Sequence, residues 1–180
     1  MATLAVTGHS NLAESAESSA PVIRKALLTL LDRYPASEPI GVSCLAEGSD
    51  ALFADAVLHV GGKLVAVLPS RDYRQRMISP RYAKEFDRLH QAAAEVQTMP
   101  YERAARPAYA AANRELLRRA ELLVAVWDGR PGAGQGGTAD AVATARTSGV
   151  PVHVVWPVGA ARQGRQREPG SKKRRTRSNF

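Results

Sequence analysis

The segment ELLVAVWDGRPGAGQGGTADAVATAR, residues 121–146, contains a strand pattern, a glycine-rich loop and a helix pattern in direct succession. The apolar run 122–127 lacks alternating polar residues, which is typical of a strand buried on both faces. The glycines allow a tight connection, and Thr138 stands where a new helix can begin. This order is typical of one unit of a parallel α/β sheet.

The same alternation of strand and helix patterns extends over most of the chain. The expected strands are residues 3–7, 40–45, 64–68, 96–99, 122–127 and 152–156, and the expected helices are residues 20–34, 49–60, 81–94, 108–120 and 138–148. The polar residues 70–82 are expected to form a loop. We therefore predict a Rossmann-like α/β fold, a doubly wound and mostly parallel sheet of about six strands with helices on both faces.

Length and charge indicate one folded domain followed by a basic tail. The chain has 180 residues, of which 44% are hydrophobic and 23% are charged, as in ordinary globular domains. Residues 159–180 contain eight Lys or Arg and one Glu, so they carry +7 of the net charge of +8. We expect residues 1–158 to form the domain and residues 159–180 to be disordered.

The sequence also predicts where the protein resides. It contains no apolar run near the roughly 20 residues of a membrane span, and its first residues lack the pattern of a signal peptide. The single cysteine, Cys44, is typical of a reducing compartment and is expected to be a core residue. We expect a cytoplasmic protein without a membrane partner.

Three loops that follow predicted strands combine glycine with polar residues just before a helix. Their candidate ligand-binding residues are Gly8, His9 and Ser10 in the first loop, Gly48, Ser49 and Asp50 in the second, and Asp128, Gly136, Gly137 and Thr138 in the third. Carboxyl ends of parallel strands share one edge of the sheet, where ligands of such folds bind. Unpaired amides at helix starts and the helix dipole favour an anion there. The alternative is that Ser49 and Thr138 only cap their helices.

Two further residues are secondary candidates at this edge. Asn113 lies on a predicted helix, and Arg71 follows the third strand, where it could hold a second phosphate. Each could equally be a solvated surface residue. The four histidines show no metal-ligand spacing and the phosphate-binding motif GxxxxGK[ST] is missing, so we expect neither a metal site nor a P-loop.

The stretches VTGHS, CLAEGSDALFADA and 121–146 resemble the SLOG superfamily of Rossmann-like proteins. That group includes cytokinin-activating phosphoribohydrolases of the LOG family, DNA-processing protein A and sensor domains for nucleotides derived from NAD. The resemblance implies a pocket for a nucleotide or nucleotide sugar, such as a nucleoside monophosphate or an ADP-ribose-related molecule. In it, Gly136, Gly137 and Thr138 would hold a phosphate, and no cofactor is implied.

The resemblance breaks down at the catalytic glutamate of the related enzymes, because this chain has Ala141 there. Asp140, one residue earlier, and Asp50 are the remaining catalytic candidates. Three functions therefore stay open. They are binding of a nucleotide derivative as a sensor, hydrolysis of an N-glycosidic bond, and weak nucleic-acid contact through the basic tail. Relatives often form homodimers, which the sequence neither supports nor excludes.

Overall fold

Strand and helix alternate along the chain in the computed structural model, which describes residues 2–13, 19–35, 39–131 and 137–163. The elements are β1 (Thr3–Gly8), α1 (Ser19–Leu31), β2 (Ile40–Ser43), α2 (Ser49–His59), β3 (Lys63–Leu68), α3 (Tyr73–Met77), α4 (Ala83–Ala92), β4 (Glu95–Thr98), α5 (Arg106–Arg119), β5 (Leu122–Val126), α6 (Thr138–Thr147) and β6 (Val152–Val154). Every expected strand and helix is present, and its ends differ by at most three residues from the expected ones.

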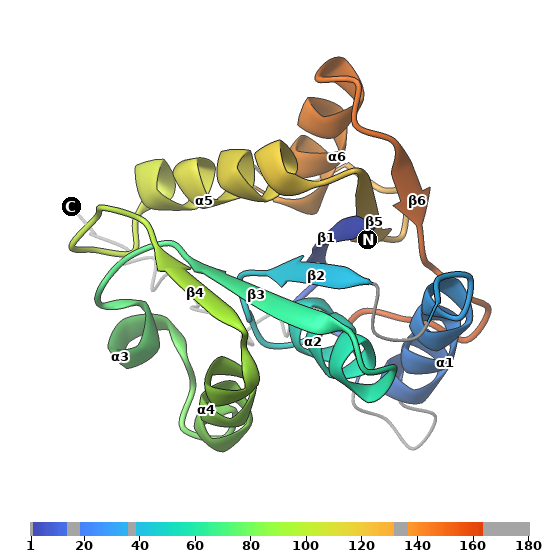
Figure 1. Cartoon of the computed structure of the whole chain (residues 1–180), viewed down its shortest axis with the longest axis horizontal. Helices are drawn as coiled ribbons and strands as arrows, with labels where there is room; N and C mark the ends of the chain where they lie inside the picture. Colours follow the sequence, from blue (N-terminus) through green and yellow to red (C-terminus); the bar gives the residue numbers. More distant parts are fainter. Residues whose placement is uncertain (1, 14–18, 36–38, 132–136, 164–180) are drawn as a thin grey trace, which may run out of the picture.

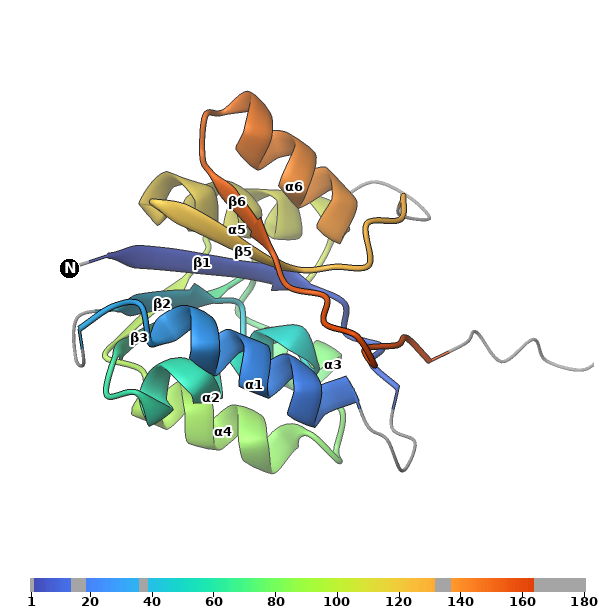
Figure 2. The same ribbon diagram turned by 90° about the vertical axis from the view of Figure 1, so that its right-hand side faces the viewer.

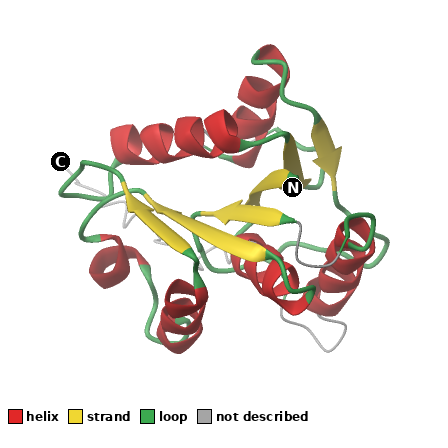
Figure 3. Ribbon diagram, viewed as in Figure 1, coloured by secondary structure: helices red, strands yellow, loops and turns green. Residues whose placement is uncertain are grey.

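The described strands form a six-stranded sheet of order β4-β3-β2-β1-β5-β6, and each neighbouring pair is parallel (Figure 1). Helices α5 and α6 cover one face, whereas α1, α2 and α4 cover the other (Figures 2 and 3). The predicted doubly wound α/β fold is thus confirmed. Among the described residues, no helix has the length and hydropathy that a membrane span requires.

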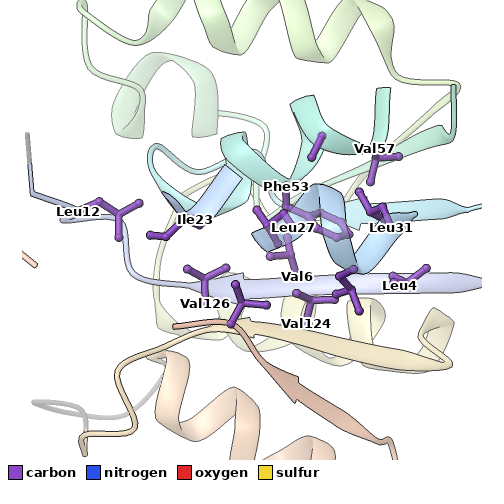
Figure 4. Close-up of a cluster of buried hydrophobic side chains, with 13 residues drawn as sticks. Leu4, Val6, Leu12, Ile23, Leu27, Leu31, Phe53, Val57, Val124 and Val126 are labelled. Carbon is purple, nitrogen blue, oxygen red and sulfur yellow. The ribbon is translucent and has the colours of Figure 1, made fainter. Parts of the chain in front are cut away.

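Burial on both faces explains why the central strands are continuous apolar runs. Alternate side chains of a strand point to opposite faces. Val6 and Val124 pack in the cluster beneath α1 and α2 (Figure 4). Ala5 and Ala125 point the other way and pack with Ala112 of α5. Because the side chains are small on both the strands and α5, this helix can lie close to the sheet.

Helix α3 corrects the expectation of a loop over residues 70–82. Tyr73 is only 3% exposed, and its ring packs against Phe86 at 6.2 Å and Tyr109 at 6.3 Å between centroids. The loop prediction was wrong because a five-residue helix is too short to show helical periodicity. The packing of one aromatic ring, which the sequence pattern does not display, holds this turn in place.

The chain beyond β6 returns to the start of the fold, and we call residues 157–163 the C-terminal strap. The N–H of Ala13 donates to the carbonyl oxygen of Ala161 at 3.0 Å, within an antiparallel contact. The described structure therefore continues past the expected domain end at residue 158. Residues 164–180 lie outside the described part, so their disorder stays a prediction.

Candidate functional site

A cavity of about 330 Å³ lies at the carboxyl ends of the central strands. The neighbouring strands β1 and β5 lead to helices on opposite faces, α1 and α6, so the connections diverge here. Such a switch point is where open α/β sheets bind ligands. Of the predicted site residues, those that line this cavity are Gly8, His9, Ser10, Asp50, Asn113, Gly137 and Thr138.

The two diverging loops are joined by His9 and Asp128. Nε2 of His9 lies 3.1 Å from Oδ1 of Asp128, and both side chains are about 10% exposed. Burial lowers the pKa of His9, although the Asp128 hydrogen bond opposes this effect. Burial acts to raise the pKa of Asp128, but hydrogen bonds from the Arg130 amide and His9 hold it below its usual value. At neutral pH a neutral imidazole therefore faces an ionised carboxylate.

Arg162 of the C-terminal strap adds a cation to this wall of the cavity. Its Nη1 lies 3.4 Å from Oδ2 of Asp128, and its Nε donates to Oδ1 of Asn11 at 3.3 Å. The guanidinium lines the cavity and remains 39% exposed. The Arg162 guanidinium is therefore accessible to an anionic ligand in the cavity.

Gly8, Gly48 and Ser49 hold the loop after β1 against α2. The backbone N–H and the hydroxyl of Ser49 both donate to the carbonyl oxygen of His9, at 3.2 and 2.7 Å. A Cβ on Gly8 would lie 2.5 Å from Cβ of Ser49. Gly48 has a φ of +92°, and a Cβ there would lie 2.8 Å from the carbonyl oxygen of Ser10. Neither Gly48 nor Ser49 is among the cavity-lining residues.

Asp50 is a buried carboxyl at the far side of the cavity. It is 8% exposed, and its Oδ2 accepts a hydrogen bond of 3.4 Å from the Ala46 amide. Burial raises the pKa of Asp50 to about 7, although the backbone amides of Ala46 and Cys44 act to lower it. Burial also raises the pKa of the neighbouring Cys44 thiol, which makes this cysteine a poor nucleophile.

Aromatic and apolar side chains form the walls around Asp50. Tyr73 comes from α3 and Tyr109 from α5, and both line the cavity with Cys44 and Leu116. Tyr109, Asn113 and Leu116 are spaced four and three residues apart, so they share one face of α5. Asn113 thus presents a polar side chain beside an otherwise apolar wall.

Helix α6 points its amide end at the opposite side of the cavity. Its first residues line the cavity together with Trp127 and Arg130, and no described side chain caps this end of the helix. Unpaired first-turn amides and the helix dipole favour an anion. Gly136 falls among residues 132–136, outside the described part of the chain.

Asp128 contacts His9 but is not among the cavity-lining residues, and two other predicted residues lie away from the cavity. Asp140 lines a separate groove between α5 and α6 with Arg114 and Thr144. Arg71 is 70% exposed and forms an ion pair of 2.8 Å with Glu102. Neither residue lines the cavity. Although Asp140 lies in the first turn of α6, its carboxyl faces the other groove.

Sequence reasoning missed several residues that line the cavity. They are Asn11, Tyr73, Tyr109, Trp127, Arg130 and Arg162. The helical spacing from Asn113 back to Tyr109 was a usable signal. Arg162 had none, because it lies in a segment that reads as a basic tail.

Neither a protein-family model nor a curated protein sequence matches the chain. Similar solved structures include DNA processing protein A from Streptococcus pneumoniae (19% identity, TM-score 0.54) and from Helicobacter pylori (16%, 0.59), the latter described with a single-stranded DNA binding mode. A third is the structural-genomics target TM1055 (18%, 0.55). The matches cover 85%, 85% and 84% of this chain, but 58%, 64% and 72% of those chains. These similarities show that the chain shares the Rossmann-like fold of those proteins.

Proposed function

We propose that this protein binds a nucleoside monophosphate, or a nucleotide derivative of similar size, in the cavity at the switch point. One observation carries the proposal: the Arg162 guanidinium and the uncapped amide end of α6 line the same cavity, whose other side is aromatic. A phosphate suits the first region, and a nucleobase suits the second.

The phosphate would lie near Gly137 and Thr138. Glycine lets an anion approach the backbone closely, and helix starts supply free N–H donors. The hydroxyl of Thr138 and the guanidinium of Arg162 are further donors at the same cavity. Charge-assisted hydrogen bonds to a phosphate are about twice as strong as neutral ones, so this region would contribute much of the affinity.

The volume favours a small ligand. Ligand pockets commonly range over about 300–1,000 Å³. The described residues enclose about 330 Å³, at the lower end of that range. This volume favours a nucleoside with one phosphate over a dinucleotide such as NAD. ADP-ribose is intermediate in size between the two.

A thermal-shift and calorimetric screen tests the proposal with AMP, CMP, GMP, UMP, ADP-ribose and NAD, with adenosine as the control without phosphate. A ligand present at 100 times its dissociation constant stabilises the folded state by about 2.7 kcal/mol. We expect one or more monophosphates to raise the melting temperature and adenosine to bind more weakly. If no nucleotide binds, the proposal is wrong.

Hydrolysis of an N-glycosidic bond is a second candidate, because Asp50 lines the cavity as a carboxyl with a pKa of about 7. Such a group can donate a proton to the departing base as the bond from the base to the sugar breaks. A water molecule then bonds to the sugar carbon and returns a proton to the carboxylate. Chromatography of the same samples would detect free base. Release should stop in Asp50→Asn and continue in Asp140→Asn, because Asp140 lies in another groove. A sensor would release no base.

Nucleic-acid contact through the basic tail stays a prediction, since most of that segment lies outside the described residues. Phosphate contacts made by Lys and Arg weaken steeply with salt. Binding of single-stranded DNA should therefore fall between 50 and 200 mM salt (roughly the range over which such contacts weaken) and disappear when residues 164–180 are removed. Retention of DNA binding by the shortened chain would contradict this role.

A further inference from the structure

The carboxyl of Asp50 has no cationic partner within the described part of the chain. Its hydrogen bonds come from the backbone amides of Ala46 and Cys44, and no cation contributes to its electrostatic environment. The side chain is 8% exposed and lines the cavity. A buried carboxyl is costly unless donors satisfy it. A bound ligand that supplies a donor would meet this need.

The surroundings of Asp50 suit a flat, mostly apolar group. Tyr73 and Tyr109 stand edge to face, with ring centroids 6.3 Å apart, and Leu116 extends the apolar wall. Aromatic walls with a few placed polar groups are typical of sites that hold planar rings. A nucleobase fits this description, whereas a sugar with hydroxyls around its ring would leave several of them unsatisfied.

The separation of the two ends also suits a nucleotide. Asp50 and Tyr73 follow β2 and β3, whereas Trp127 and Thr138 follow β5. From β5 to β2, the strand that Asp50 follows, the sheet has two strand spacings, or about 10 Å at 4.8 Å each. If the phosphate of a nucleotide lies beside Thr138, its base would therefore lie near the Asp50 carboxyl.

We propose that Asp50 accepts a hydrogen bond from an exocyclic amino group of the base, so that the protein selects amino-bearing bases over their oxo counterparts. The inference rests on the proposed nucleotide site and adds the chemical class of its base. Asn113, whose amide can donate or accept a hydrogen bond, also lines this cavity.

Calorimetry with two matched ligand pairs tests this selectivity. AMP and IMP differ at one amino or oxo position, and so do CMP and UMP. At pH 8, where Asp50 is mostly ionised, we expect at least one amino-bearing member to bind about tenfold or more tightly than its partner, as a charged hydrogen bond implies. Asp50→Asn should bring the pair close to parity, because an amide can serve either base. Asp140→Asn, in the groove between α5 and α6, should keep the wild-type preference.

A second measurement keeps the test decisive if Asp50→Asn fails to fold. Carbon-13 NMR of the wild-type carboxyl should show that the amino-bearing ligand lowers the pKa of Asp50 and that its oxo partner does not. The titratable groups facing Asp50 are Cys44, Tyr73 and Tyr82, and burial raises the pKa of each, so Asp50 is the group that titrates near neutrality.

The outcomes separate the two proposals. Equal affinity for both members of each pair, or an unchanged preference in Asp50→Asn, would overturn the base selectivity and leave the nucleotide site standing. Failure of these four monophosphates, and also of GMP, ADP-ribose and NAD, to bind would overturn the nucleotide site itself. A preference that Asp50→Asn removes and Asp140→Asn keeps supports both.

Discussion

Nε2 of His9 lies 3.1 Å from Oδ1 of Asp128, and this contact joins two loops whose residues are 119 positions apart. It forms because β1 and β5 are neighbours, with Gly8 paired to Val126 at their carboxyl ends. Arg162 extends the contact to the C-terminal strap. One wall of the cavity therefore depends on three distant segments of the chain.

Asp128→Asn should destabilise the protein by about 1–2 kcal/mol, because the buried hydrogen bond to His9 loses its charged acceptor. Urea unfolding at pH 7 measures this change. The matched control is Asp32→Asn, at an exposed site, which should change the free energy of unfolding by less than about 0.5 kcal/mol. Equal effects of the two substitutions would show that the contact contributes nothing to stability.

Arg162→Ala should weaken AMP binding about tenfold, since it removes a charge-assisted hydrogen bond to phosphate. Binding of adenosine should stay unchanged, because adenosine has no phosphate. Arg71→Ala is the control, since that side chain lies outside the cavity lining and pairs with Glu102. Calorimetry with both ligands distinguishes the two arginines. A tenfold loss in Arg71→Ala alone would assign the phosphate contact to the loop after β3 instead.

Asp50→Asn should change how stability depends on pH. The folded pKa of about 7 lies above the unfolded value near 3.9. This carboxyl therefore favours folding most below pH 3.9, and its contribution is lost as the pH rises towards 7. Asparagine does not titrate, so the variant should gain roughly 2–3 kcal/mol relative to wild type between pH 5 and pH 8.

Urea unfolding of both proteins at the two pH values, without nucleotide, measures that gain. Parallel pH profiles would mean that Asp50 has an ordinary pKa in the folded protein. Asp50 would then make no pH-dependent contribution to the free energy of unfolding, whatever the nucleotide-binding results.

Gly48→Ala should destabilise the protein more than Gly149→Ala. Both glycines have positive φ, +92° and +75°, so alanine is strained at either position. Only at Gly48 would the new Cβ meet backbone atoms, at 2.8 and 2.9 Å from the carbonyl oxygens of Ser10 and His9. We expect the free energy of unfolding to fall by about 1 kcal/mol in Gly149→Ala, because of backbone strain alone, and by at least twice as much in Gly48→Ala. If both variants shift the urea midpoint equally, the loop after β1 adjusts to a Cβ at position 48 without cost.

Local patterns were sufficient to predict the fold and the edge of the sheet at which the cavity lies. Continuous apolar runs identify strands buried on both faces, and parallel strands bring the loops that contain Gly8, His9, Asp50 and Thr138 to one edge. These inferences need only periodicity within a few residues and the general handedness of strand–helix–strand units.

Contacts between distant segments needed the tertiary structure. Helix α3 depends on one aromatic ring, and Arg162 reaches the cavity only because the C-terminal strap pairs with the loop after β1. Asp140 lies at the predicted helix start, yet the rotation of α6 places its side chain in another groove. The sequence by itself determined at which edge of the sheet the cavity lies. Only the packing of helices and strap decided which side chains face it, because side-chain direction depends on how elements pack and not on their order.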